Sequence, residues 1–255
     1  MKSRPLILIS NDDGIHAEGI QVLAKALQKI ARVVVVAPDR EQSASSHSLT
    51  LRRPLRVVRH SPWQFSVDGT PTDCVILAVH EVLKRRPDLV VSGINAGPNL
   101  GEDVHYSGTV SAAVEGALIG IPSVAVSLVA FEGRRFHFNT AALFAKKVCH
   151  RLLKFPQSKR PEGFVLNVNI PNCPMDKVRG IEFTQLGKRD YGDVIFKKID
   201  PRGKKYYWIG GSGYSFEDIP GSDGNAIEKK KISVTPLMVD MTDRSLLAEI
   251  MKWKF

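Results

Sequence analysis

Four consecutive valines at positions 33–36 restrict the fold of this 255-residue chain more than any other feature. A short, unbroken run of β-branched residues is typical of a strand buried on both faces, as in a parallel sheet. Four earlier apolar residues repeat with helical spacing: Ile20, Leu23, Ala24 and Leu27. They predict a helix over about residues 17–30, and the apolar run 6–9 before it predicts another strand. These segments together predict one right-handed βαβ unit.

The same alternation continues to about residue 172. Strands are predicted at 49–51, 55–59, 65–67, 87–92, 124–128 and 164–170. Helices are predicted at 70–85, 110–119 and 139–154, with Thr70, Pro71 and Asp73 starting the first and Asn139 capping the last. Strands that alternate with helices predict an α/β protein with a mostly parallel sheet.

The pattern changes after residue 173, where helical periodicity is absent until 242–252. Strand-like segments lie at 181–185, 194–199, 206–209 and 232–236, and a Gly- and Ser-rich loop covers 210–225. We expect β-hairpins that project from the core and pair with another subunit. The expected division is a catalytic core over 1–172 and an extension for oligomerisation over 173–255, with one continuous domain as the alternative.

The first strand is followed directly by Asn11, Asp12, Asp13 and Gly14. Ligands of an open α/β sheet bind at the carboxyl ends of its strands. Two adjacent carboxylates there are candidate ligands for one hard divalent cation, Mg²⁺ or Mn²⁺. The alternative is that the acids only cap the next helix and that Gly14 only permits the turn.

Hard oxygen donors also follow two later strands: Ser43 follows the valine strand, and Asn95 lies in a loop rich in Gly and Pro. Ser107, Gly108 and Thr109 then precede a helix of small residues. The amino end of a helix offers free N–H groups and a positive dipole to a phosphate. Helix capping by Ser107 or Thr109 is the alternative.

Loops at the carboxyl ends of parallel strands share one edge of the sheet, so these donors can converge. A divalent cation at such a site polarises a phosphoryl oxygen and lowers the pKa of a bound water. The chain is therefore predicted to be a metal-assisted phosphomonoester hydrolase. Asp12 is expected to act as a base or to position the water, while Ser107 and Thr109 hold the phosphate.

Other classes of protein fit less well. A dinucleotide-binding oxidoreductase should carry G-x-G-x-x-G after the first strand, which is absent. A phosphatase that forms an aspartyl-phosphate typically has Asp-x-Asp, whereas here the acids are adjacent. The net charge of +10 permits a basic nucleic-acid-binding protein, but no such signature accompanies it.

The cysteines Cys74, Cys149 and Cys173 form no C-x-x-C motif, so neither a zinc site nor a disulfide framework is expected. The most apolar stretch, 119–131, is too short to span a bilayer. A cytoplasmic protein without a membrane partner is the expectation.

Seven segments of the chain resemble the SurE (stationary-phase survival protein) nucleotidases, in the same order. They are residues 9–15, 36–43, 46–50, 68–74, 91–101, 106–110 and 232–237. The resemblance implies a Rossmann-like three-layer core and a C-terminal extension that is exchanged between the subunits of a homodimer or homotetramer. It implies hydrolysis of nucleoside 5′- and 3′-monophosphates, with short polyphosphate as a further substrate.

Matched by motif, the resemblance implies one Mg²⁺ or Mn²⁺ per subunit. The implied metal ligands are Asp12, Asp13, Ser43 and Asn95. The implied phosphate-binding residues are Asn11, Ser107, Gly108 and Thr109. Asp12, Asp13 and Asn95 form the implied catalytic set.

The chain departs from the family pattern near its end, with Met238 where members often have His. Three histidines, His16, His47 and His105, are expected near the site, where an imidazole can protonate a leaving group. A structural role is the commoner alternative for each. The aromatic and basic segment 204–208 is either a nucleobase contact or a buried edge strand.

Overall fold

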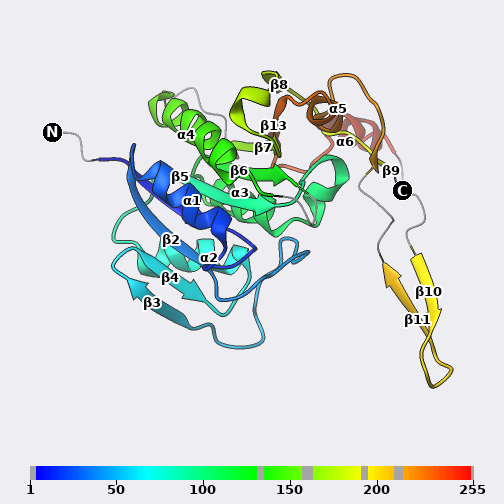
Figure 1. The fold of residues 1–255 in the computed structure, drawn as a ribbon, viewed down its shortest axis with the longest axis horizontal. Helices are drawn as coiled ribbons and strands as arrows, with labels where there is room; N and C mark the ends of the chain where they lie inside the picture. Colours follow the sequence, from blue (N-terminus) through cyan, green and yellow to red (C-terminus); the bar gives the residue numbers. More distant parts are fainter. Residues whose placement is uncertain (1–3, 131–134, 157–162, 191–194, 210–214, 254–255) are drawn as a thin grey trace.

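The computed structural model describes residues 4–130, 135–156, 163–190, 195–209 and 215–253, and all structural statements concern these residues. Their main feature is a sheet of nine strands in the order β3-β4-β2-β1-β5-β6-β7-β13-β8 (Figure 1). The strands are β1 Leu6–Ser10, β2 Arg32–Pro38, β3 Val57–Ser61, β4 Gln64–Val67, β5 Leu89–Ala96, β6 Ser123–Val129, β7 Val165–Pro171, β8 Ile181–Phe183 and β13 Ile232–Leu237. The mostly parallel α/β fold predicted from the sequence is confirmed.

Helices cover both faces of this sheet and complete three layers. Helices α1 (Glu18–Leu27) and α4 (Phe138–Lys154) pack on one face, where the larger apolar core lies. Helices α2 (Pro71–Leu77) and α3 (Gly108–Leu118) pack on the other face. The valine strand β2 contributes alternately to the two faces, as a strand buried on both sides must.

The strand order reverses at β1. Its parallel neighbours are β2 on one side, with Ile9 beside Val35, and β5 on the other, with Ser10 beside Ser92. The connection that leaves β1 runs through α1 to β2, whereas the connection that leaves β5 runs the opposite way along the sheet to β6. Such a reversal places a crevice at the carboxyl ends of β1 and β5. Residues 11–14 occupy this position.

Two predicted helices differ in detail. Helix α2 starts as expected with a capping box between Thr70 and Asp73, but the α-helix ends at Leu77 and a π-helix, η1 (Ala78–Val82), continues it. The prediction that Asn139 caps α4 is wrong, because α4 begins one residue earlier. There the buried Phe138 stacks on Phe136 with ring centroids 5.3 Å apart, which fixes the start of the helix by packing. Residues 49–51 form no strand.

The C-terminal part returns to the main sheet. Strand β13 lies antiparallel to β7 and parallel to β8. Four short strands lie between β8 and β13 in the sequence. β9 (Arg189–Asp190) pairs with β12 (Ser215–Phe216), and β10 (Ile195–Ile199) forms with β11 (Lys205–Ile209) a hairpin that projects from the body (Figure 1). Of the predicted segments, residues 131, 194 and 210–214 lie outside the described residues. The division at residue 172 stays a prediction.

Two helices occupy the C-terminal part besides the short 3₁₀ turn η4 (Met175–Lys177). The terminal helix α6 (Arg244–Ile250) was predicted, whereas α5 (Asp223–Glu228) was not. Helix α5 is only six residues long and therefore has too little sequence to show a helical period. A further 3₁₀ turn, η2 (Gly101–His105), leads into α3.

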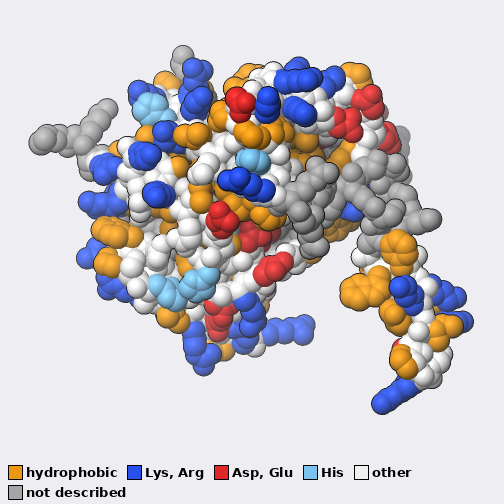
Figure 2. Space-filling view, viewed as in Figure 1, with side chains coloured by type: hydrophobic (Ala, Val, Ile, Leu, Met, Phe, Trp, Pro, Cys, Tyr) orange, Lys and Arg blue, Asp and Glu red, His pale blue; other side chains and the backbone are white. Residues whose placement is uncertain are grey.

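Basic side chains are spread over the visible face of the molecule instead of forming one stripe (Figure 2). The projecting hairpin carries apolar and basic side chains together (Figure 2). None of the helices in the described part of the chain combines the length and the hydropathy needed to cross a membrane. The three cysteines form no disulfide, and Cys74 and Cys149 are buried in the core.

Candidate active site

Asp12 and Asp13 lie in the turn that leaves β1 at the crevice. Gly14, with φ of 95°, makes the turn possible, and the Asn11 side-chain amide donates to the Gly14 carbonyl at 2.9 Å. The N–H of Gln42, in the loop after β2, donates to the Asp12 carbonyl at 2.8 Å. The turn is therefore held to its own backbone and to the neighbouring loop.

Asp12 is buried against the amino end of α3. The Thr109 hydroxyl donates to Asp12 Oδ1 in a short hydrogen bond. Gly108 lies so close that a Cβ on it would be 2.8 Å from the Asp12 Cβ and 2.7 Å from the Ser45 Oγ. Helix α3 thus begins in direct contact with the carboxylate-bearing residue.

Asp13 contacts the loop that carries Asn95. The Ala96 N–H donates to Asp13 Oδ2 at 3.3 Å. The register between β5 and β6 shifts between Gly93 and Asn95, so the strand is irregular just before this contact. Asn95 donates its own amide to the Gly97 carbonyl at 3.0 Å, a bond that does not use the amide oxygen.

The two acids are electrostatically unfavourable neighbours. Burial raises the pKa of Asp12, although hydrogen bonds from Thr109 oppose the rise. Burial, and then the negative charge of Asp12, raise the pKa of Asp13 to about 7. No described Lys, Arg or His forms an ion pair with either acid. The pair therefore lacks a compensating cation.

This imbalance predicts that Asp13→Asn stabilises the metal-free protein. The pKa of Asp13 is about 7 in the folded protein and 3.8 in the unfolded chain, so between these pH values the folded state keeps a proton that the unfolded chain has released. The stability that this protonated carboxyl contributes is fully present at low pH and is lost as the pH rises through about 7. In chelator at pH 8, calorimetry should show a higher Tm for Asp13→Asn than for wild type. The free energy of unfolding should be larger by about 1–2 kcal/mol.

The same comparison at pH 5 is the control, because wild-type Asp13 is then largely protonated and the difference in Tm should shrink. A lower Tm for Asp13→Asn at pH 8 would mean that the carboxylate is compensated in the folded protein. The proposed excess of negative charge would then be wrong.

Ser43 lies at this edge but points elsewhere. Its hydroxyl donates to the Glu41 carboxylate at 2.5 Å, and its side chain is exposed. Glu41 was not among the predicted site residues, yet its charge raises the pKa of both Asp12 and Asp13. It can be found in the sequence only as an acid two residues before Ser43, which by itself is a weak signal.

The predicted phosphate-binding residues divide into two groups. Ser107 accepts from the Val110 N–H at 3.0 Å and so caps α3, and Thr109 holds Asp12. Asn11, by contrast, has a buried Oδ1 with no hydrogen-bond partner among the described residues, and so does the Oγ of Ser45, a residue that was not predicted. Such atoms are costly unless a ligand or water pairs with them.

Neighbouring loops are anchored by residues that the sequence analysis did not identify. The Asn99 carbonyl accepts from Asn167 and Asn169 on β7, at 2.8 and 2.9 Å, and the Asn99 amide donates to Ser127 at 2.7 Å. Asp223 on α5 accepts from the N–H of Gly101 and of Gly187, each at 2.8 Å. The loop after β5 is thus fixed from the C-terminal part of the chain.

The three histidines have separate surroundings. His47 pairs with Glu115 of α3 at 2.8 Å, and His16 meets the ring of His60 edge-on at 5.7 Å. His105 contributes its carbonyl, which accepts from the Ser46 hydroxyl at 2.7 Å. Tyr207 and Trp208 on the hairpin are more than half exposed, so the alternative of a buried edge strand is wrong within this chain.

The donors at this edge suit a hard cation. Among the described residues, no cluster of three or more His, Cys, Asp or Glu side chains surrounds a metal position. Two adjacent carboxylates, with an amide and a hydroxyl on neighbouring loops, are nevertheless oxygen donors of the kind that Mg²⁺ and Mn²⁺ prefer. Mg²⁺ usually binds through only one or two carboxylates and keeps several waters, so the donor set fits.

The fold defines a doubly wound α/β protein, and its topological switch point carries two acidic residues as a candidate site. A sequence model of the family described as "Survival protein SurE" matches residues 7–193. The chain belongs to this family, as the resemblance of the seven segments predicted.

Individual relatives agree with this assignment. The chain is 50% identical over 247 residues to the "5'-nucleotidase SurE" of Geobacter sulfurreducens, covering 97% of this chain and 93% of the relative. It is 49% identical over 257 residues to that of Myxococcus xanthus, covering 100% and 95%. The crystal structure of the SurE protein from Aquifex aeolicus matches with a TM-score of 0.87 and 44% identity, over 96% of this chain and 98% of that one.

Proposed function

We propose that this protein is a nucleotidase that removes the phosphate of nucleoside 5′-monophosphates and depends on one divalent metal ion, Mg²⁺ or Mn²⁺. The observation that carries the metal is the adjacent pair of Asp12, which is buried, and Asp13, which is half-buried, because no described cation forms an ion pair with either. The relatives that bear the name 5'-nucleotidase, at about half identity over nearly the full length, support the reaction.

Four residues would hold the metal: Asp12, Asp13, Asn95 and Ser43. When bound, the ion polarises a phosphoryl oxygen and lowers the pKa of a bound water. Ser43 would have to turn from Glu41 to take part. Asp12 then serves as the base or orienting group for the attacking water, with Thr109 fixing its carboxylate.

The phosphate would lie against the start of α3. The N–H groups of Gly108 and Thr109 belong to the first turn, where the helix dipole favours an anion. Asn11 directly follows β1, and the Ser45 Oγ is 2.7 Å from where a Cβ of Gly108 would lie. The unpaired Asn11 Oδ1 and Ser45 Oγ can each form a hydrogen bond with substrate or ordered water. Activity on 3′-monophosphates and short polyphosphate remains part of the proposal on the family resemblance alone.

The test is phosphate release from a panel of nucleoside 5′- and 3′-monophosphates, tripolyphosphate and p-nitrophenyl phosphate. Each substrate is assayed with Mg²⁺, with Mn²⁺ and with excess chelator. We expect release from 5′-monophosphates that chelator abolishes and added metal restores. A preference for nucleotides over p-nitrophenyl phosphate should appear in kcat/KM.

Release that survives chelation would exclude the metal from the reaction. A phosphate label trapped on an aspartate after acid quench would instead identify an aspartyl-phosphate mechanism. Release from p-nitrophenyl phosphate but from no nucleotide would overturn the substrate class and keep the metal chemistry.

We also propose a homodimer or homotetramer that is formed by the C-terminal part. Helix α6 buries none of its residues: its Leu246 is 55% exposed, and Met251, directly after the helix, is 78% exposed. On the hairpin, Ile199 and Ile209 are 64% and 85% exposed. Apolar surface of this kind on projecting elements is typical of a subunit contact.

A cytoplasmic location remains a prediction from the sequence.

A further inference from the structure

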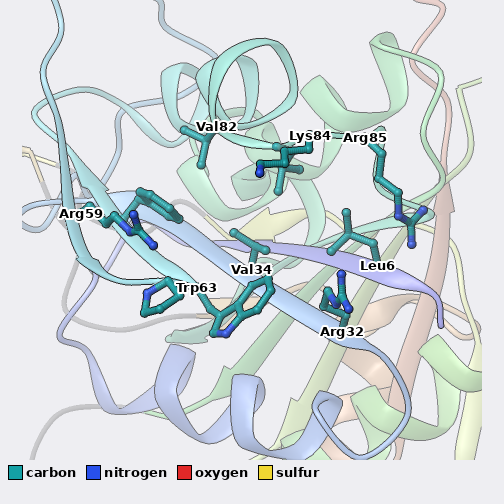
Figure 3. A pocket seen from close by; sticks show the side chains of 11 residues that line it. Leu6, Arg32, Val34, Arg59, Trp63, Val82, Lys84 and Arg85 are labelled. Carbon is teal, nitrogen blue, oxygen red and sulfur yellow. The ribbon is translucent and has the colours of Figure 1, made fainter. Parts of the chain in front are cut away.

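A second concave surface lies at the amino-terminal edge of the sheet, opposite the acidic edge. It is a pocket of about 560 Å³ between the starts of β1 and β2, the β3–β4 hairpin and the end of η1 (Figure 3). Leu6 of β1 lines it, whereas Asp12 follows the other end of the same strand. Four residue steps of a strand separate Leu6 from Ser10, which is about 13 Å. A ligand here would not compete for the catalytic crevice.

Cations surround this pocket from four sides. Arg32 begins β2, Arg59 lies on β3, and Lys84 and Arg85 follow η1, and all four side chains reach the pocket (Figure 3). No carboxylate is among the described residues that line it. Two acids lie beside it: Asp88 pairs with Arg85 at 3.0 Å, and Glu81 lines an adjoining hollow.

Three of the four cations have no ion pair with a described carboxylate, namely Arg32, Arg59 and Lys84. Several unpaired cations that face one hollow repel one another, and a multiply charged anion relieves that repulsion. Arginine in particular matches the oxygens of a phosphate with two parallel N–H bonds. The charge of the pocket therefore favours a phosphate group over a neutral ligand.

The floor of the pocket is apolar and aromatic. Val34 and Leu6 lie beside the indole of Trp63 (Figure 3), and Phe65 also lines the pocket. Trp63 is 47% exposed, with the Arg32 guanidinium 5.4 Å from its ring centroid. An exposed indole beside a guanidinium offers stacking to a planar ring. The volume lies within the range of small-molecule sites.

From these observations we propose that the pocket is a second ligand site, for a small organic phosphate that carries a planar ring and at least two negative charges. A nucleoside di- or triphosphate has this chemistry. The ring lies against Trp63, and the phosphates lie against Arg59 and Lys84, which have no ion pair with a described carboxylate. The proposal is independent of the reaction at the acidic edge.

Calorimetric titration with adenosine 5′-(β,γ-imido)triphosphate tests the site, because this probe resists hydrolysis. The full chain in Mg²⁺ is compared with Arg59→Glu/Lys84→Glu. The matched control is Lys25→Glu/Lys147→Glu, which makes the same charge change at exposed positions on α1 and α4, across the sheet. Asp12→Asn removes any contribution from the acidic edge.

We expect the Arg59/Lys84 variant to bind the probe at least tenfold more weakly, while the control binds as wild type does. Asp12→Asn should retain the binding that depends on Arg59 and Lys84. Trp63→Phe should remove the change of tryptophan fluorescence that the probe causes. Adenosine and inorganic triphosphate, each presenting half of the ligand, should both bind at least tenfold more weakly than the probe.

Three results would overturn the proposal. One is equal binding by the two double variants, which would reduce the effect to net charge. Another is loss of all binding in Asp12→Asn, which would place the probe at the acidic edge. The third is a single-stranded oligonucleotide that binds far more tightly than the free probe, which would make the surface part of a nucleic-acid groove.

Discussion

Replacing Asp12 with Asn should lower turnover on nucleoside monophosphates by roughly 10³-fold or more while the fold is retained. The amide has the shape of the carboxylate, and its oxygen can still accept from the Thr109 hydroxyl. What is lost is the negative charge that would hold the cation and orient the water. Cation chemistry of this kind contributes several kcal/mol of transition-state stabilisation, and each 1.4 kcal/mol is a factor of ten.

The measurement is kcat and kcat/KM in saturating Mn²⁺, with Tm recorded on the same samples. Asp176→Asn is the matched control, because Asp176 is an exposed acid in η4, outside the candidate site. It should keep wild-type activity. An Asp12→Asn enzyme within tenfold of wild type would remove Asp12 from the mechanism, whatever its effect on metal binding.

The sequence predicted the parts of the fold that are encoded locally. The valine run of β2 is unbroken and the apolar face of α1 has a helical period, so the first βαβ unit follows from them. The position of Asp12 and Asp13 follows too, because a turn after β1 in a parallel sheet must lie at the carboxyl edge. Local patterns and sheet topology were sufficient at this point.

Details set by tertiary packing could not be predicted in the same way. The change from α2 to a π-helix at Ala78 has no motif, and the start of α4 depends on the packing of Phe138 more than on a capping side chain. Asp223 receives hydrogen bonds from Gly101, 122 residues away in the chain. Such contacts are visible only once the distant segments have been placed together.

The hydrogen-bond partners of the candidate site residues could not be predicted from the sequence either. Sequence motifs predict Asp12 and Thr109 as site residues, but they do not reveal that the Thr109 hydroxyl donates to Asp12. Motifs also cannot show that Ser43 pairs with Glu41. Residue type predicts what a side chain is able to bind, whereas its actual partner depends on which loops meet.

The contact between α3 and Asp12 leads to the second large effect: Gly108→Ala should lower turnover by about 10²-fold. The new methyl group would lie 2.8 Å from the Asp12 Cβ and 2.7 Å from the Ser45 Oγ, so either the helix or the acidic turn must shift. A shift of about 1 Å in a catalytic arrangement is enough for a loss of this size. The defect should lie mainly in kcat.

Gly116→Ala on the same helix separates this effect from general destabilisation. Its methyl group would lie 2.5 Å from the Ser123 Oγ and 2.9 Å from Val90, against the sheet and away from the acids. We expect Gly116→Ala to lower Tm, because the helix must move from the core, yet to keep kcat per folded molecule. Equal losses of kcat in both variants would show that activity follows the overall packing of α3. A loss confined to Gly108→Ala would show that the amino end of this helix sets the position of Asp12.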